Sequence, residues 1–171
     1  MKTLNLILFL SISSFIACSN DDSSEVTTSN DKGIKTEVTN TDQEKLLELV
    51  NKYRKNGCQC GDNYFGPTTP VTWNNLLENA ALLHSEDMSK NSNLSHTGSN
   101  GSSPSIRITN AGYTWATNGE NIARGYNTVE AVIEGWIKSP GHCKNIMNPN
   151  FAEMGVAKSG AYWTQLFARK R

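Results

Sequence analysis

Apolar residues recur at helical intervals in two segments of the first half of the chain. Thr41 and Glu44 have the spacing of a capping box, which predicts a helix that ends at Gly57. A second helix is expected to begin near Thr72. One stripe of this helix is mostly apolar and contains Trp73, Leu77, Ala80, His84 and Met88. We therefore expect His84 to point toward the core or its margin and to have a structural role.

Start and stop signals predict three further helices. Ser103-Pro104 and Ser139-Pro140 each place a capping residue before a proline at the first helical position, where the missing N–H has no cost. The first of these helices should end at Gly112, and the second before Pro149. Between these two helices, Asn127-Thr128 begins a further helix that should end before Pro140.

The pattern changes after Pro149 to two short runs, EMGVAKS and AYWTQLFA, separated by Ser159-Gly160. This predicts a β-hairpin. Both alternating sets of the second run contain bulky residues, so this strand should be covered on both faces. GYTW, at residues 112–115, is expected to add a strand. Helices followed by a small antiparallel sheet predict an α+β fold with helices on both faces of the sheet.

Residues 1–18 have the composition of an export signal. One early lysine precedes an apolar run from Leu4 to Ile16, which is too short to span a bilayer as a stable helix. The run ends in Phe-Ile-Ala-Cys, which resembles the lipobox where bacterial lipoproteins are cut and acylated. We expect Cys18 to become the N-terminus and to carry a lipid that anchors the protein to a membrane. The alternatives are an ordinary signal peptide cut nearby and a disulfide made by Cys18.

Residues 19–40 are polar and contain few large apolar side chains. Burial of these few side chains cannot offset the entropy lost when a chain becomes ordered. The segment is expected to form a disordered tether. Its Ser-Asn-Asp-Asp start resembles the acidic signal that places some lipoproteins on the outer face of the outer membrane; a plain solvated linker is the alternative. Residues 41–171 have the size of one domain with a single core.

The charge of the chain excludes one class of partner. Lys and Arg number 16, and Asp and Glu also number 16, without a dense basic run. Nucleic-acid binding therefore has no electrostatic basis. The expected location is the cell envelope, with the protein exported, lipid-anchored in the outer membrane and exposed at the surface.

Three cysteines remain beyond Cys18, in a chain expected to reach an oxidising compartment where disulfides persist. A bridge between Cys58 and Cys60 would close a strained small ring. We therefore expect Cys143 to pair with one of the two and to leave the other spare. Zinc held by the three cysteines and a histidine is the alternative, although such sites usually have C-x-x-C spacings.

Most chemically capable side chains fall in three stretches: LSHTGSNGSS around His96, GENIA around Glu120, and SPGHCKNIMNP around His142. Each is expected at the end of an element, where clefts are built. His142 falls in the first turn of its helix, whose free N–H groups favour a neutral imidazole. Two imidazoles and a carboxylate that converge make either a divalent-metal site or an acid–base pair.

These stretches, together with VTWNNLLENAALLHSEDM and YWTQLFA, closely resemble the bacterial branch of the CAP superfamily, also called SCP-like. This superfamily includes cysteine-rich secretory and plant pathogenesis-related proteins. The resemblance covers about Asp42 to Ala168. It implies an α–β–α sandwich with a three-stranded antiparallel sheet, and a cleft where two His and two Glu bind zinc or another divalent cation. By position it assigns His96, Glu120 and His142 to three of these four places.

The fourth place departs from the pattern of the family. The family's other Glu falls three residues after the tryptophan of the preceding helix, and Ser139 occupies that position here. Glu134 and Glu153 are the candidate substitutes. The remaining alternative is a site of two His and one Glu with water in the open position, which has less negative charge to hold the ion.

The resemblance favours a binding module, an envelope-anchored domain whose cleft holds a divalent cation and a lipid or envelope-polymer ligand. The alternative is a peptidase-like zinc hydrolase with three catalytic residues, in which His96 and His142 hold the metal and Glu120 activates water. A structural envelope protein with a vestigial site is a third interpretation. The chain has no H-E-x-x-H or Ser-His-Asp signature, which counts against hydrolysis.

Overall fold

The computed structural model describes residues 38–171. The expected signal peptide, its lipobox cysteine Cys18 and residues 19–37 of the expected tether lie outside the described residues. In chain order the elements are α1 (Asn40–Asn56), β1 (Cys58–Cys60), β2 (Asn63–Phe65), β3 (Thr72–Trp73), α2 (Asn75–Asn91), α3 (Pro104–Asn110), β4 (Trp115–Arg124), α4 (Val129–Lys138), α5 (Pro140–Met147), β5 (Glu153–Ser159) and β6 (Tyr162–Lys170). None of the helices in this range combines the length and the apolar character that a membrane span requires.

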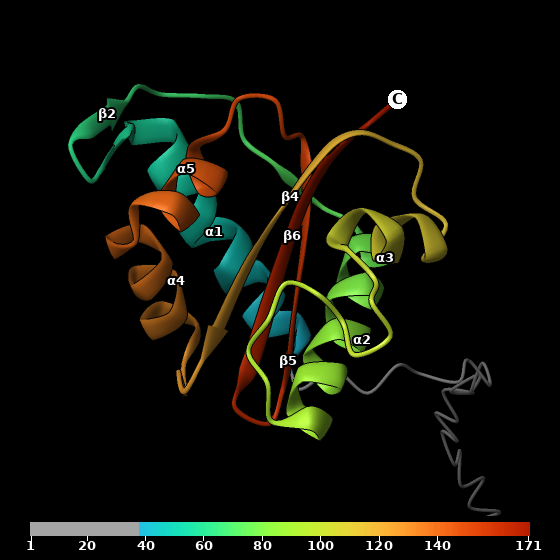
Figure 1. Ribbon diagram of the computed structural model, residues 1–171. Helices are drawn as coiled ribbons and strands as arrows, with labels where there is room; N and C mark the ends of the chain where they lie inside the picture. Colours follow the sequence, from blue (N-terminus) through green and yellow to red (C-terminus); the bar gives the residue numbers. More distant parts are fainter. Residues whose placement is uncertain (1–37) are drawn as a thin grey trace, which may run out of the picture. The chain divides into compact units, whose positions relative to one another are not determined.

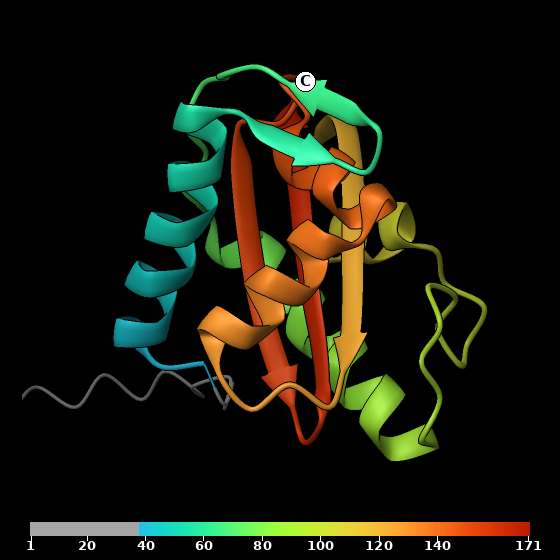
Figure 2. The same ribbon diagram turned by 90° about the vertical axis from the view of Figure 1, so that its left-hand side faces the viewer.

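The central sheet has the strand order β3-β5-β6-β4. Strands β5 and β4 each pair antiparallel with β6 between them, which confirms the expected three-stranded antiparallel sheet (Figures 1 and 2). The two-residue strand β3 adds a short parallel edge beside β5. The hairpin of β5 and β6 turns at Gly160, whose φ of 55° favours glycine. A separate hairpin, β1 with β2, stands outside this sheet.

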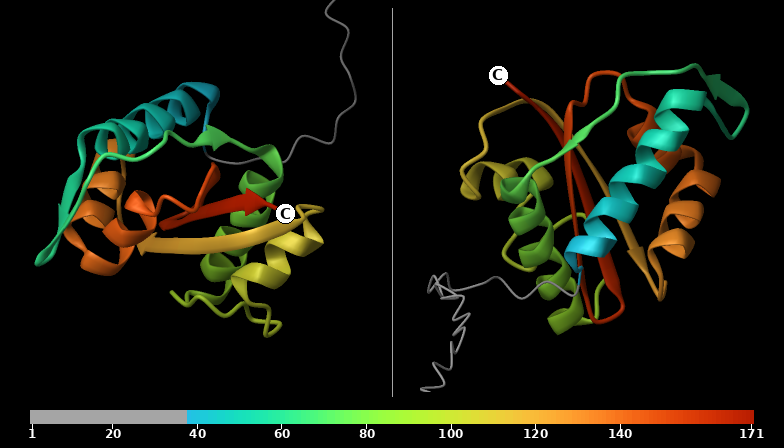
Figure 3. Two further views of the ribbon diagram at one scale, coloured as in Figure 1. Left: turned by 90° about the horizontal axis from the view of Figure 1, so that it is seen from above. Right: turned by 180° about the vertical axis from the view of Figure 1, so that it is seen from behind.

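Helices cover both faces of the sheet, as expected, and make an α–β–α sandwich (Figure 3). Helices α1, α4 and α5 cover one face, over a core that includes Leu46, Val50, Val132, Trp136, Ile146, Met154, Trp163 and Phe167. Helices α2 and α3 cover the other, over Leu77, Ala80, Ala81, Ile108, Ala157, Leu166 and Ala168. Strand β6 thus contributes Trp163 and Phe167 to one layer and Leu166 to the other, as the two bulky alternating sets predicted.

Two helices begin at other residues than expected. The capping box of α1 uses Thr39 and Asp42 in place of Thr41 and Glu44, because the Asp42 carboxylate accepts from the Thr39 backbone N–H at 3.0 Å. Residues 72–73 pair with β5 and do not start a helix. Helix α2 begins after them, where Asn74 accepts from two backbone N–H groups of the first turn.

Strand β4 is much longer than the predicted strand at residues 112–115, because it runs from Trp115 to Arg124 and includes GENIA. Glu120 therefore lies in the middle of a strand, and the expectation that it would lie at the end of an element is wrong. The strand is at the edge of the sheet, and its polar first half has no hydrophobic alternation to identify it.

A disulfide joins Cys60 in β1 to Cys143 in α5, and Cys58 keeps a free, buried thiol. This confirms the expectation that Cys143 pairs with one cysteine of the C-x-C pair and leaves the other spare. The bridge ties the β1–β2 hairpin to the layer of α1, α4 and α5. Zinc held by all three sulfur atoms would require its reduction.

Candidate functional site

The candidate site is built around the carboxylate of Glu120. In β4 this residue is paired with Leu166 of β6, so its side chain enters the layer covered by α2 and α3. The Glu120 side chain is only 2% exposed. A carboxylate buried to this degree is costly unless it is paired and hydrogen-bonded.

Two side chains from other elements satisfy the Glu120 carboxylate. Arg107, in α3, donates from Nη2 to Oε2 at 2.6 Å, and the arginine side chain is itself only 8% exposed. His96, in the segment between α2 and α3, contacts Oε1 through Nδ1 at 2.7 Å. Both carboxylate oxygens are therefore engaged, one by a guanidinium and the other by an imidazole.

The same arginine also fixes the backbone that carries His96. Arg107 donates to the carbonyl oxygens of Ser102 at 2.8 Å and of His96 at 3.1 Å. At the other side of the segment, the Asp87 carboxylate accepts from the Ser99 backbone N–H at 2.8 Å and from the Ser99 hydroxyl. These hydrogen bonds hold the pKa of Asp87 below its ordinary value. The segment that presents His96 is thus fastened to α2 and α3.

A second histidine, His84 of α2, lies under this segment and is 1% exposed, as its place on the apolar stripe predicted. Its Nε2 lies 2.9 Å from the Ser95 carbonyl oxygen and 4.0 Å from Glu120 Oε1. A carbonyl only accepts, so Nε2 carries the proton. Burial lowers the pKa of His84, although the charge of Glu120 acts to raise it. The net lowering favours the neutral ring.

His96 and His142 differ in their surroundings. The His96 side chain is 54% exposed, and its hydrogen bond to Glu120 raises its pKa. His142 lies in the first turn of α5, as predicted, and is half-buried. Burial lowers the pKa of His142, and the charge of His96 lowers it further.

His142 lines a cavity of about 280 Å³ between β4 and the helices α4 and α5. Its other lining residues are Leu94, Ile122, Ala123, Arg124, Tyr126, Gly135, Trp136 and Ser139. The lining is mainly apolar beside the imidazole. The Ser139 side chain makes no capping hydrogen bond to α5, although Pro140 occupies the first helical position as expected.

Asn121 connects β4 to the helix that carries His142. Its Nδ2 donates to the His142 carbonyl oxygen at 3.2 Å and to Gln165 Oε1 at 2.9 Å. Asn145, also in α5, donates from Nδ2 to the Glu120 carbonyl oxygen at 3.0 Å and to Asn121 Oδ1 at 2.9 Å. Both Asn121 and Gln165 are fully buried. These amides hold the first turns of α5 against the strand at Glu120.

The structure brings the three predicted site residues together in part. His96 and Glu120 are in direct contact, whereas His142 approaches from the layer on the opposite face of the sheet. Among residues 38–171, the only group of three or more His, Cys, Asp or Glu with ligand atoms all within 4.8 Å of one another is Cys58, Cys60 and Cys143. His96, Glu120 and His142 therefore do not make so close a group.

Neither candidate for the fourth place joins this site. Glu134 is exposed on α4 and pairs with Lys138 at 2.6 Å. Glu153, in β5, accepts from Asn74 Nδ2 at 2.9 Å and from the hydroxyl of Tyr113. In the part of the chain that the structure describes, both carboxylates thus have partners elsewhere.

The sequence did not identify Arg107, which is the main partner of Glu120. An arginine in a short helix usually lies at the surface, and no local pattern marks this one as buried. Asn121 was also missed, although it follows Glu120 directly. Alternation along a strand would have placed it on the opposite face, had GENIA been recognised as strand.

A carboxylate that holds one nitrogen of a histidine is the arrangement that often supports a metal-binding imidazole. Here Glu120 takes Nδ1 of His96, which leaves Nε2 as the nitrogen for a ligand. A cation bound directly to Glu120 would have to compete with both His96 and Arg107. The geometry therefore suits Glu120 better as an orienting group than as a ligand.

Comparison with known proteins agrees with this architecture. Residues 47–167 match the CAP (cysteine-rich secretory protein) family, and the chain belongs to this family. It is 36% identical over 131 residues to the uncharacterized protein YkwD of Bacillus subtilis (strain 168), a match that covers 75% of this chain and 47% of YkwD. It is 30% identical over 134 residues to the uncharacterized membrane protein YlbC of the same strain, a match that covers 78% of this chain and 36% of YlbC. The chain thus spans less than half the length of these curated relatives.

Two solved structures have the same fold. One is an extracellular protein containing a SCP domain from Bacillus anthracis, with a TM-score of 0.67 and 27% identity over 81% of this chain and 45% of that chain. The other is an outer surface protein from Borrelia burgdorferi, with a TM-score of 0.66 over 80% and 98% of the two chains. At 20% identity, the second shows the fold alone.

Proposed function

We propose that this protein is an exported CAP domain, anchored to the cell envelope through a lipid on Cys18, that works as a binding module. The lipobox-like Phe-Ile-Ala-Cys supports the anchor. The similarity to a protein described as extracellular supports the location. Replacing Cys18→Ser should move the protein from the membrane fraction to the soluble fraction. An unchanged membrane fraction would refute the anchor.

The cleft beside β4 is the proposed binding site. We propose that His96 and His142 bind zinc or another divalent cation, with Glu120 as the group that orients His96. The single observation that carries this proposal is the contact of Glu120 with His96 Nδ1, because it directs Nε2 outward. Two imidazoles alone hold a divalent cation weakly and leave coordination positions open to a ligand.

The cavity beside His142 supports a ligand with an apolar part, such as a lipid or a fragment of an envelope polymer. The bound cation would supply a Lewis acid next to this cavity. The hydrolase alternative needs Glu120 to activate water. Its engagement by Arg107 and His96 disfavours that role, and no observation favours the hydrolase over the binding module.

Zinc uptake by the purified chain tests this assignment, measured by equilibrium dialysis in a Cys58→Ser background that removes the spare thiol. Joint replacement of His96 and His142 by Ala should abolish uptake without unfolding the protein. Glu120→Gln should weaken it by about 10–100-fold, the range for loss of an orienting partner. Glu134→Gln, an exposed carboxylate, is the matched control and should have no effect. Full uptake by the double histidine variant would overturn the site.

A further inference from the structure

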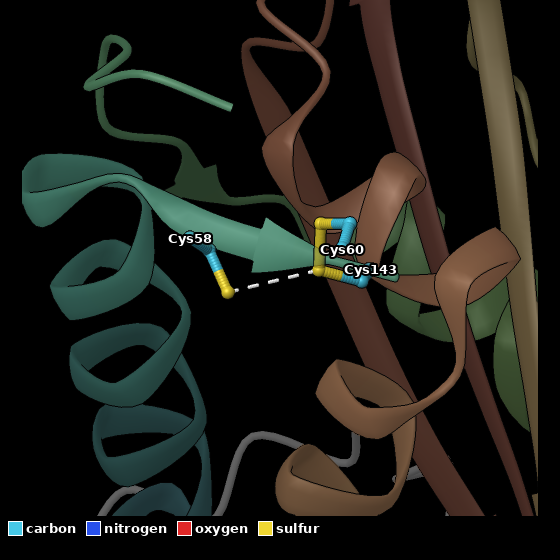
Figure 4. A group of neighbouring side chains, drawn as sticks. All are labelled: Cys58, Cys60 and Cys143. Carbon is cyan, nitrogen blue, oxygen red and sulfur yellow. Dashed lines mark hydrogen bonds between the residues drawn. A yellow bond between two sulfur atoms is a disulfide. The ribbon is translucent and has the colours of Figure 1, made fainter. Parts of the chain in front are cut away.

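Three sulfur atoms gather where β1 meets α5. Figure 4 shows Cys58 and Cys60 on β1 and Cys143 on the neighbouring helix. Their Sγ atoms all lie within 4.8 Å of one another. Each residue is at most 8% exposed, so the group is closed to bulk solvent.

The C-x-C spacing explains how one helix residue meets two cysteines. Side chains at i and i+2 of a strand point to the same face. In β1 both cysteines are buried, and Gln59 between them is exposed. The hairpin pairing of Cys58 with Phe65 and of Cys60 with Asn63 holds this orientation. The strand therefore presents two equivalent sulfur positions to Cys143.

Cys58 is placed as a nucleophile toward the existing bridge. The disulfide joins Cys60 and Cys143, whose Cα atoms are 5.4 Å apart. The Cys58 Sγ lies 3.7 Å from the Cys143 Sγ, which is close to van der Waals contact between sulfur atoms (Figure 4). Thiol–disulfide exchange proceeds by attack of a thiolate on one sulfur atom of a disulfide, so this contact joins the two reacting atoms.

We propose that Cys58, Cys60 and Cys143 form a thiol–disulfide exchange site in which the bridge moves between Cys60–Cys143 and Cys58–Cys143. The Cys58 thiol gives up its proton, and its sulfur attacks the Cys143 Sγ. As the new bond forms, the Cys60–Cys143 bond breaks, and Cys60 leaves as a thiolate that takes up a proton. One thiol and one disulfide are present before and after, so the step needs neither oxidant nor reductant.

The two bridges are closely matched in the chain entropy that they remove. They join residues 83 and 85 positions apart, and the entropy of a cross-link varies only with the logarithm of loop length. Packing around the free thiol therefore decides their populations. Both bridges keep β1 fastened to α5, so neither requires the hairpin to detach. A bridge within the C-x-C pair would close a strained small ring and is not a product.

Burial sets the rate of this exchange. It raises the pKa of the Cys58 thiol, so little thiolate exists at neutral pH. Exchange should accelerate about tenfold per pH unit while the thiol remains mostly protonated, because the thiolate is the reacting species. The closed surroundings also limit competition from external thiols.

The test locates the free thiol in a Cys18→Ser background, which removes the fourth cysteine. The chain is incubated at neutral or mildly alkaline pH without added thiol, quenched in acid, unfolded in acidic denaturant and labelled with N-ethylmaleimide. Fragment-ion mass spectrometry is needed because only Gln59 separates the two sites. We expect the N-ethylmaleimide label on both Cys58 and Cys60. The labelled fraction of Cys60 should reach its final value sooner at alkaline pH. Label on Cys58 alone at every pH would overturn the proposal.

Three variants form matched controls. Cys58→Ser should fix the Cys60–Cys143 bridge, and Cys60→Ser should form the Cys58–Cys143 bridge, so both should lack a free thiol. Cys143→Ser removes the shared partner and should leave two free thiols. A folded Cys60→Ser chain with two free thiols would overturn the exchange. Should this variant fail to fold, the labelling pattern of the chain with all three cysteines decides.

Discussion

Glu120 and Asn121 are adjacent in β4, yet their side chains enter different layers of the sandwich. Glu120 meets the guanidinium of Arg107 and two imidazoles on the side of α2 and α3. Asn121 meets amide groups and a backbone carbonyl on the side of α5. One face of the strand therefore carries a charged centre and the other a neutral hydrogen-bond network.

The two faces of β4 therefore have different structural roles within one short stretch of sequence. The neutral network fixes the backbone, because it ties the Glu120 carbonyl and the His142 carbonyl to side chains of the opposite element. The charged centre orients His96. Stability should therefore depend on both faces, whereas the Asn121 network contains no titratable side chain and should contribute equally at mildly acidic and neutral pH.

The largest effect should follow from Arg107→Met, which leaves the Glu120 carboxylate buried without its cation. Breaking a buried pair in this way typically costs about 3–5 kcal/mol. Urea unfolding followed by circular dichroism measures the loss. Arg169→Met is the matched control, since this arginine is exposed, and it should change stability by less than about 0.5 kcal/mol. Equal effects of the two substitutions would show that the charged face is not a buried pair.

A smaller loss should follow from Asn121→Ala on the neutral face. The substitution leaves the buried side-chain oxygen of Gln165 without this partner, and an unsatisfied buried group costs about 1–3 kcal/mol. The same unfolding assay should give a loss that does not vary between mildly acidic and neutral pH. A loss that grows on acidification would contradict the separation of the two faces.

His84 should contribute to the pH response, in the same direction as His142, whose pKa burial also lowers. The pKa of His84 is lowered in the folded protein, so below the ordinary value of 6.5 the unfolded chain binds a proton that the folded chain does not. Stability should therefore fall as the pH drops below about 6.5. His84→Gln keeps a donor for the Ser95 carbonyl and should flatten this decline, whereas Asn121→Ala should keep it. Parallel curves for His84→Gln and the unchanged chain would refute this origin.

His96 should act in the opposite direction and more weakly. Its folded pKa is raised, so its stabilising contact is fully present below about 6.5 and is lost as the pH rises through the folded pKa. Its side chain is more than half exposed, so solvent screens the contact. The effect of His96 on stability should therefore be smaller than that of His84.

The layers of the fold were predictable because their patterns are local. Helical periodicity and proline signals located α3, α4 and α5, and the two bulky sets of β6 predicted burial on both faces. Strand β4 was missed because an edge strand with Thr, Asn, Gly and Glu in its first half resembles a loop. The error mattered, since the alternation of β4 decides which layer Glu120 enters.

The contacts around Glu120 could not be predicted from the sequence, and the assignment of the site residues stays a prediction. Resemblance to a family identified His96, Glu120 and His142, but no spacing in the sequence reveals that a buried arginine occupies the second oxygen of Glu120. That contact joins residues 13 positions apart through the packing of α3 against β4. Tertiary packing, and not a motif, therefore brings both His96 and Arg107 into contact with Glu120.

The most direct test of this account is the protonation of His96, followed by NMR of the imidazole nitrogen and carbon-bound proton signals. We predict that neutral His96 carries its proton on Nδ1, facing Glu120, and that Glu120→Gln lowers the pKa of His96. Glu134→Gln should leave both unchanged. A neutral ring protonated on Nε2, or a pKa that does not respond to Glu120→Gln, would contradict the central claim that Glu120 orients this histidine.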